Sequence, residues 1–165
     1  MTKSNSKRAS LARQHGDQWE RKVKKECQDV ADAELAVVRK NHEAKNVPGS
    51  HVKREPSKPD FSGFVCDGGR HVVFEAKATL VTTRFDFDDI RDHQAEHLKL
   101  AYEARAIAFV YVLDGRRRRW VLPWRQVVAM KEFRSSFPFS IETYQKVKGE
   151  TWLDAWHRLE REGLT

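Results

Sequence analysis

The sequence feature that most limits the possible folds is an unbroken apolar run, IAFVYVL, at positions 107–113. A strand with one exposed face alternates apolar and polar residues, whereas a strand covered on both faces is apolar throughout. A segment with helical periodicity precedes the run, and another strand-like segment precedes that helix. The sequence therefore predicts an α/β fold with a mixed central β-sheet flanked by helices.

The second strand-like segment, HVVFEAKATL at positions 71–80, places charged residues within an apolar strand. It follows the turn residues CDGG, and the run FSGFV at 61–65 suits the preceding strand of a hairpin. Because side chains alternate along a strand, Glu75 and Lys77 share one face. The hairpin then brings Asp60 close to Glu75, so we expect two carboxylates and an ammonium to meet at one end of the sheet.

This residue set is suited to metal-assisted hydrolysis of a phosphodiester. Carboxylate oxygens are ligands for Mg²⁺ or Mn²⁺, and a nearby lysine can orient or deprotonate the attacking water. A structural alternative is that Asp60 caps a turn while Glu75 and Lys77 form a solvated pair on a half-exposed strand. These residues alone favour the structural alternative, so other features of the chain have to decide.

Length, charge and cysteine content narrow the class of protein. A chain of 165 residues suits one domain, and a net charge of +7 favours a polyanionic partner. The two cysteines, Cys27 and Cys66, do not make a disulfide framework, and no apolar stretch for export or membrane insertion occurs at the N-terminus. We therefore expect a cytoplasmic protein.

The first 15 residues carry cationic side chains and no acidic residue, which predicts a disordered basic arm ahead of a single domain at 16–165. The cations of this arm are Lys3, Lys7, Arg8 and Arg13. A helix is expected from about Gly16 into the 31–36 region, with Glu20 at the edge of its apolar stripe. That stripe contains Trp19, Val23, Cys27, Val30 and Leu35. Residues 36–40 suit a short strand, and residues 41–59 suit a loop.

A further helix is expected at about 89–105, with Asp88 as its N-cap. Its inward stripe combines Gln94 with the apolar residues Ile90, Leu98 and Ala101. A buried amide needs a partner, so Gln94 reaches either the carboxylates, a bound phosphate or nearby backbone. His93 and His97 have zinc-compatible spacing, but further ligands at metal-site spacing are missing, which favours solvent-facing or DNA-facing histidines.

A basic turn follows the apolar run 107–113. Asp114 and Gly115 precede four consecutive arginines, and WVL at 120–122 suits a return strand. We expect phosphate contact from these arginines rather than a merely solubilising turn, given the charge of the chain. They are Arg116, Arg117, Arg118 and Arg119. Two C-terminal helices are expected, from about residue 123 and about Thr151, with Trp152, Trp156 and Leu159 in the core.

The chain resembles the RecU-type Holliday junction resolvases, within the nuclease superfamily named for the pattern P-D…(D/E)-x-K. The pattern is present as Pro59-Asp60 and Glu75-Ala76-Lys77. The blocks DFSG at 60–63, FEAKAT at 74–79, HQAEH at 93–97 and IAFV at 107–110 follow in the order of that family. Gly16 and Glu20 in the first helix also fit.

The resemblance implies a restriction-endonuclease-like core and a metal-dependent endonuclease. Such an enzyme acts as a homodimer in a bacterial or phage-infected cell and makes paired, symmetric nicks across a four-way DNA junction. By position, Asp60 and Glu75 would hold Mg²⁺, or Mn²⁺, together with the backbone carbonyl of Ala76. Lys77 would assist the attacking water, Gln94 would support the site, and Glu20 is a weaker catalytic candidate. Expected DNA contacts are Thr79, the arm residues Lys7, Arg8 and Arg13, and the four arginines of residues 116–119.

The chain also departs from that family. The family carries a longer segment before its motif aspartate, which forms a stalk that enters the junction, whereas only residues 41–59 are available here. Pro59 replaces the hydroxyl residue expected before the aspartate. Two alternatives follow: a restriction-type or repair nuclease of the same superfamily that cuts duplex or flap DNA, and a non-catalytic DNA-binding module.

Overall fold

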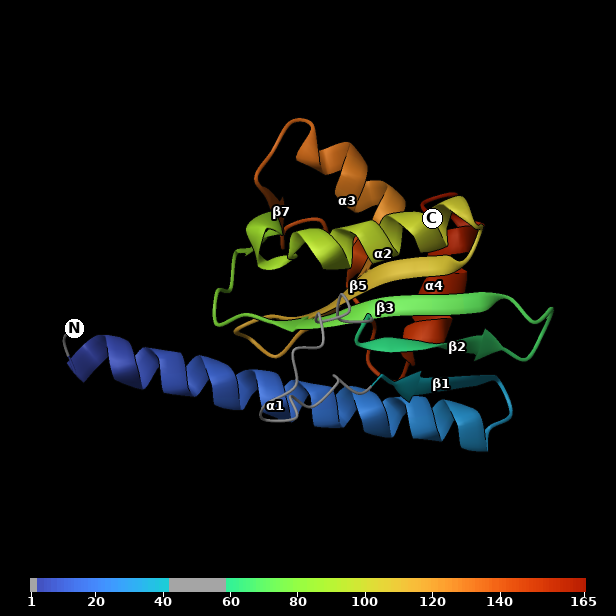
Figure 1. Ribbon diagram of the computed structural model, residues 1–165, viewed down its shortest axis with the longest axis horizontal. Coiled ribbons are helices and arrows are strands. Elements are labelled where there is room, and N and C mark those ends of the chain that lie inside the picture. The colour runs from blue at the N-terminus through green and yellow to red at the C-terminus, as the bar shows by residue number, and fades with distance from the viewer. Residues whose placement is uncertain (1–2, 42–58) are drawn as a thin grey trace, which may run out of the picture.

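The computed structural model describes residues 3–41 and 59–165, so most of the predicted 41–59 loop lies outside the described residues. A five-stranded sheet forms its centre (Figure 1). Its spatial order is β1 (Ala36–Lys40), β2 (Phe61–Val65), β3 (His71–Ala78), β5 (Ile107–Leu113) and β6 (Arg119–Pro123). Strands β3 and β5 are parallel, and the other neighbours are antiparallel. The predicted mixed sheet is confirmed.

The strand pattern follows from burial and from one close backbone approach. Every residue of β5 is buried, as its apolar run predicted. The predicted hairpin of β2 and β3 is present, with Phe61 opposite Phe74. In β2, a Cβ at Gly63 would lie 1.9 Å from the carbonyl oxygen of Val37. Glycine at this position therefore lets β1 pair closely with β2.

Helices cover both faces of the sheet. Helix α1 (Lys3–Asp32) and helix α4 (Trp152–Arg161) lie on one face, while α2 (Asp92–Glu103) and α3 (Trp124–Lys131) lie on the other (Figure 1). The first face is aromatic: Phe74 stacks on Phe109 with ring centroids 4.6 Å apart, and Trp152 packs against both rings. Trp19 of α1 meets Tyr111 edge to face at 4.7 Å.

A smaller sheet packs beside the end of the main one. It pairs β4 (Arg84–Asp86) with β7 (Ser136–Pro138), and the short 3-10 helices η1 (Phe87–Asp89) and η2 (Glu142–Tyr144) flank it. Trp120 of β6 stacks on Phe139 at 4.8 Å, which joins this sheet to the main core. The predicted core residues Trp152, Trp156 and Leu159 are all buried.

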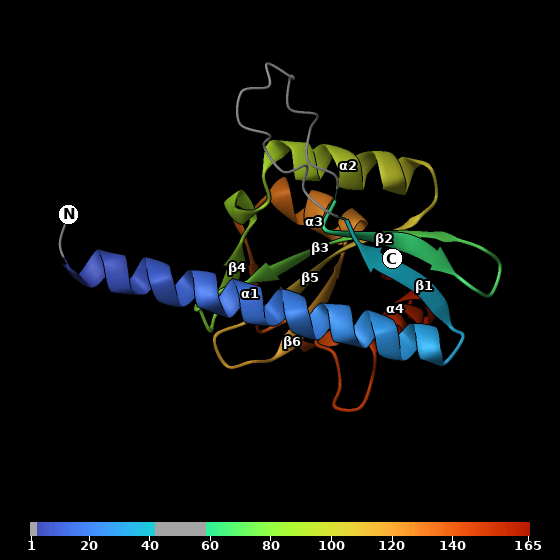
Figure 2. The ribbon, with the colours of Figure 1, turned by 60° about the horizontal axis from the view of Figure 1, so that its bottom comes forward.

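Three helix predictions need correction. Helix α1 begins at Lys3, so residues 3–15 are helical where a disordered arm was expected, and α1 extends past the sheet (Figure 1 and Figure 2). It ends at Asp32, and Leu35 is exposed rather than part of the buried stripe. Helix α2 begins at Asp92 with Arg91 as N-cap, because Asp88 belongs to η1.

Two further observations concern the cysteines and the length of the helices. Cys27 is buried, Cys66 is exposed, and both are free thiols. Within the described residues, no helix is both long and apolar enough to cross a membrane.

Candidate active site

The first two expected site residues lie opposite each other on neighbouring strands. Because Phe61 pairs with Phe74 in the antiparallel register, Asp60 falls opposite Glu75. The backbone N–H of Asp60 donates to Oε1 of Glu75 at 3.3 Å, and the N–H of Ala76 donates to Oδ2 of Asp60 at 3.1 Å. The hairpin therefore brings the two carboxylates together, as the sequence predicted.

Glu75 is fully buried, which is unusual for a carboxylate. Burial, and then the negative charge of Asp60, raises the pKa of Glu75 to about 9. Two carboxylates in so dry a position repel each other unless a proton or a cation lies between them. The two carboxylates therefore favour the binding of a proton or a metal cation, because the protein does not fully compensate their charge.

Gln94 connects both charged residues of β3 from the first turn of α2. Its Nε2 donates to Oε2 of Glu75 at 2.7 Å, and its Oε1 accepts from Nζ of Lys77 at 2.6 Å. The backbone N–H of Arg91 also donates to this oxygen at 3.1 Å. With an acceptor and two donors assigned, the amide has one orientation, and it holds Glu75 and Lys77 in a fixed relation. The predicted inward position of Gln94 is confirmed.

Asp89, at the end of η1, is a neighbour of Lys77 that the sequence did not single out. Burial, and then Asp86, raises the pKa of Asp89, while the charge of Lys77 opposes that rise. The signal was available: three acidic residues fall within residues 86–89, directly before the helix that carries Gln94.

The donor chemistry of the pair fits a hard divalent cation. Both contributing side chains offer oxygen only, and Mg²⁺ is typically held by one or two carboxylates with water and substrate oxygens completing its shell. Among the described residues, no three His, Cys, Asp or Glu side chains come together as a metal site. The structure thus provides two carboxylates, and the predicted part of the Ala76 carbonyl in a metal shell stays a prediction.

Glu20 is not brought into this group. Its carboxylate forms an ion pair with Lys40 at the end of β1, and the two side chains are about equally exposed. Lys40 pairs with Phe61, the residue that follows Asp60. Glu20 therefore lies against the strand next to the site, and its catalytic role stays a prediction.

The arginines of residues 116–119 divide into two kinds. Nε of Arg118 binds Asp114 at 2.7 Å, and Arg119 binds the buried Glu26 at 3.1 Å. Arg116 and Arg117 are exposed, and their side chains make no ion pair within the described part of the chain. Half of the predicted phosphate-contacting set is thus engaged with internal carboxylates.

The other expected DNA contacts are spread over two elements. Lys7 and Arg13 are exposed on α1, and Arg8 lies on the same helical stretch, although its side chain is outside the described ones. Thr79 follows β3, and its hydroxyl accepts from the N–H of Val81 at 3.1 Å. Contacts of these residues with DNA stay predictions.

Glu26 forms a buried junction between distant parts of the chain that sequence reasoning missed. Its carboxylate accepts from the N–H of Trp152 at 2.6 Å, from the hydroxyl of Tyr111 at 3.0 Å and from Arg119. Burial raises the pKa of Glu26, and the neighbouring charges of Lys146 and Arg119 oppose the rise. This carboxylate ties α1, β5, β6 and the start of α4 together.

Comparison with known proteins now adds to this geometry. The family model described as "Recombination protein U" matches residues 14–148, which is most of the chain. The chain therefore belongs to the RecU family. The mixed sheet with helices on both faces is the α/β fold that the sequence predicted.

Similar proteins carry names consistent with that family. The chain is 41% identical over 59 residues to "Holliday junction resolvase RecU" of Staphylococcus aureus strain JH9, and equally to that of strain JH1. These matches cover 36% of this chain and 27% of each relative, so the chain spans about a quarter of the length of the curated relatives it matches. The solved structure of Archaeoglobus fulgidus Hjc, titled a Holliday junction resolvase, aligns at 19% identity with a TM-score of 0.41. That alignment covers 67% of this chain and 78% of the other.

Proposed function

We propose that this chain is a Mg²⁺-dependent endonuclease that resolves four-way DNA junctions by paired, symmetric nicks, acting as a homodimer in the cytoplasm. The observation that carries the proposal is the linked set of Asp60, Glu75, Gln94 and Lys77 in a chain of the RecU family. The relatives named Holliday junction resolvase support the choice of a four-way junction as substrate.

Asp60 and Glu75 would hold the metal, which Mn²⁺ could replace. When bound, such an ion polarises the scissile phosphate and lowers the pKa of a coordinated water. Glu75 has to give up its proton to bind a cation, since only the deprotonated carboxylate is a good ligand. Binding of a metal at the buried Glu75 would therefore be accompanied by release of a proton.

Lys77 contributes a fixed positive charge beside the carboxylates. Its ammonium is held by Gln94 at 2.6 Å, so it is oriented before substrate arrives. In that position it can stabilise the extra negative charge of the pentacovalent phosphate and orient the attacking water. Gln94 does not change charge during such a reaction, and its part is to position Glu75 and Lys77 relative to each other.

The test is cleavage of an end-labelled four-way junction beside a linear duplex made from the same arms. Wild type and Asp60→Asn are each assayed with Mg²⁺ and with EDTA, and the stoichiometry of the complex is measured by light scattering. Paired nicks in the junction alone, lost with EDTA and with Asp60→Asn, are expected. Equal cutting of both substrates would move the proposal to a general nuclease, and no cutting of either would leave a DNA-binding module.

A further inference from the structure

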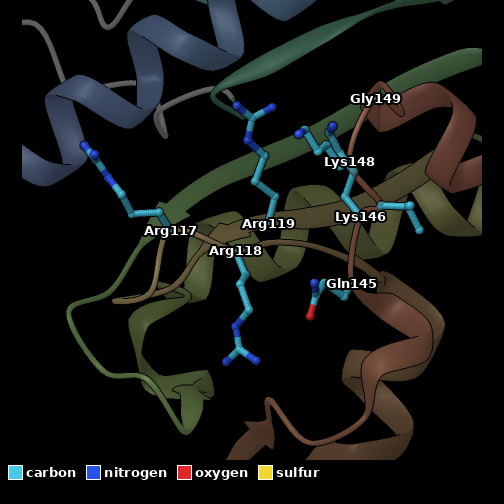
Figure 3. Close-up of a pocket in the computed structure, with 8 residues that line it drawn as sticks. Arg117, Arg118, Arg119, Gln145, Lys146, Lys148 and Gly149 are labelled. Atoms are coloured by element: carbon cyan, nitrogen blue, oxygen red, sulfur yellow. The ribbon is translucent and has the colours of Figure 1, made fainter.

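A cationic pocket lies at the turn that joins β5 to β6 (Figure 3). It has a volume of about 330 Å³. The turn between β5 and β6 forms one wall and the loop after η2 forms the other. The lining residues are Arg117, Arg118, Arg119, Gln145, Lys146, Val147, Lys148 and Gly149. Five of these eight residues are cationic and none is acidic.

The cations of the pocket are not equally compensated. Arg118 and Arg119 are each paired with an internal carboxylate, as described above. Arg117 and Lys148 are exposed, and neither forms an ion pair or a side-chain hydrogen bond within the described part of the chain. In Figure 3, Arg117 and Arg119 extend toward the α1 side, whereas Arg118 and Gln145 point the opposite way. The uncompensated Arg117 thus points toward the α1 side of the pocket.

Lys146 adds a partly desolvated ammonium. Its Nζ donates to the backbone carbonyl of Glu150, and burial followed by the charge of Arg119 lowers the pKa of Lys146, against the opposing effect of Glu26. An ammonium in such a place gains stability when an anion approaches. The pocket therefore has the electrostatic character of an anion site.

The backbone around the pocket is fixed by hydrogen bonds from both walls. The N–H of Lys146 donates to the carbonyl of Arg119 at 2.8 Å, and Gln145 bridges to Trp120. The carboxylate of Asp114 accepts from the backbone N–H groups of Arg116 at 2.9 Å and Arg118 at 2.8 Å. The cations are therefore presented by a preorganised frame, which reduces the entropy lost when they bind a ligand.

The same turn is also attached to the chain that leaves the catalytic strand. Thr79 donates its N–H to the carbonyl of Leu113 at 2.9 Å, and Gly115 donates to Val81 at 3.0 Å. A Cβ at Gly115 would lie 2.2 Å from the carbonyl oxygen of Leu80. The turn and the segment after β3 thus hold each other in place.

The pocket and the carboxylate pair nevertheless face different sides of the sheet. Glu75 and Lys77 meet Gln94 of α2, whereas the guanidinium of Arg119 lies over the ring of Trp19 of α1, 5.7 Å from its centroid. Strands β3 and β6 are separated by β5 alone, which places them roughly 10 Å apart across the sheet. Because the carboxylate pair faces α2 and Arg119 faces α1, each face suits a different part of the substrate.

We propose that this pocket binds a backbone phosphate of a DNA arm other than the one cut at the carboxylate pair, with Arg117, Lys146 and Lys148 as its contacts. The inference deepens and rests on the proposed function. A phosphodiester is favoured over a base because the lining is cationic and includes no aromatic ring, and phosphate contacts fix orientation without reading sequence. The loop of residues 145–149 thereby joins the DNA-binding surface.

The test compares two charge-matched double variants in an Asp60→Asn background, where the junction is not consumed. Arg117→Gln with Lys148→Gln removes two exposed cations of the pocket, and Lys131→Gln with Arg134→Gln removes two exposed cations at the end of α3. Dissociation constants for a labelled four-way junction are measured by fluorescence anisotropy between about 50 and 200 mM KCl. Thermal unfolding of each variant verifies that the fold is retained.

The pocket variant is expected to bind the junction about tenfold more weakly, with a salt dependence reduced by about one in log-log slope. The α3 variant should lose much less, and Arg117→Lys with Lys148→Arg should bind like the parent. Equal losses in both double variants, or no loss in the pocket variant, would overturn the proposal. Because binding is read without cleavage, failure of the pocket is distinguished from failure of the proposed nuclease activity, which the Mg²⁺-dependent wild-type assay reports.

Discussion

The carboxylate pair and the cationic pocket differ in the sign of the charge that the protein leaves uncompensated. At the pair, burial and the negative charge of Asp60 outweigh the positive charge of Lys77 and raise the pKa of the buried Glu75. At the pocket, Arg117 and Lys148 are exposed and lack negative charge. From this difference we expect changes at the pair to affect the cleavage reaction and changes at the pocket to affect DNA binding.

The sharpest way to break this comparison is to neutralise the pair. Asp60→Asn should reduce cleavage by about 10³-fold or more, which corresponds to about 4 kcal/mol of lost transition-state stabilisation. Binding should be unchanged or tighter, since one charge that repels phosphate is gone. Single-turnover cleavage and anisotropy measure the two effects. Asp67→Asn, an exposed change on the same hairpin, serves as control and should cut like wild type.

Substitution of Glu26 measures how much its buried junction contributes to the stability of the fold. Glu26→Ala leaves the N–H of Trp152 and the guanidinium of Arg119 without their acceptor, which should lower the free energy of unfolding by about 3 kcal/mol. The melting temperature would then fall by roughly 6–12 °C. Thermal unfolding provides the measurement, and the exposed Asp29→Ala on the same helix should change little. An unchanged melting temperature for Glu26→Ala would show that the junction contributes no net stability.

Substitution of Gln94 tests its positioning role without changing the charge of the site. Gln94→Leu keeps the approximate size of the side chain but removes both links, so activity or metal affinity should fall about 10- to 100-fold. Metal titration of cleavage distinguishes a loss of affinity from a loss of rate. Gln126→Leu on α3 is the matched control, because within the described residues the side-chain amide donates to the carbonyl of Leu164 alone. A Gln94→Leu enzyme with wild-type metal dependence and rate would contradict the positioning role.

The pH dependence of stability should differ between the metal-free and metal-loaded protein. Because the pKa of Glu75 is raised from 4.5 to about 9, the folded protein keeps a proton that the unfolded chain has released. This contribution is fully present below pH 4.5 and is lost as pH rises through about 9. Denaturation midpoints in EDTA should therefore decline across that window, and Glu75→Gln should flatten the decline. Excess Mg²⁺ should stabilise wild type most at the alkaline end.

The smallest expected effect concerns Arg116, which is exposed and lies outside the pocket lining. Arg116→Gln should change junction affinity less than threefold and leave the salt slope close to that of the parent. Titrations at several salt concentrations provide the measurement. If this single change weakened binding as much as the Arg117 and Lys148 pair, the pocket would lose its distinction from the general field of the turn.

Local patterns predicted the sheet and the pair well, and the reasons are physical. Alternation in β3 and the unbroken apolar run of β5 report burial directly, and a hairpin links Asp60 to Glu75 over only 15 residues. Gln94 was identified because an amide on an apolar stripe requires a partner.

Predictions that depended on distant partners or on competing local structures were incomplete. The carboxylate of Glu26 meets Trp152 across 126 positions, a contact that no local pattern contains. The loop of residues 145–149 has no local pattern that indicates a binding role, and only the structure places it beside the arginine turn. Leu11 is the one large apolar side chain of residues 3–15, but the segment also includes good helix formers such as Ala9 and Ala12 and continues the helix that Trp19 anchors.

The separation in sequence between contacting residues also bears on the order in which the molecule assembles. The pair and its Gln94 link lie within residues 60–94, so their contacts close short loops and carry a low entropic cost. The contact between Glu26 and Trp152 closes a loop that spans 126 positions. We therefore expect the reactive carboxylates to meet Gln94 before the C-terminal helix docks on the opposite face of the sheet.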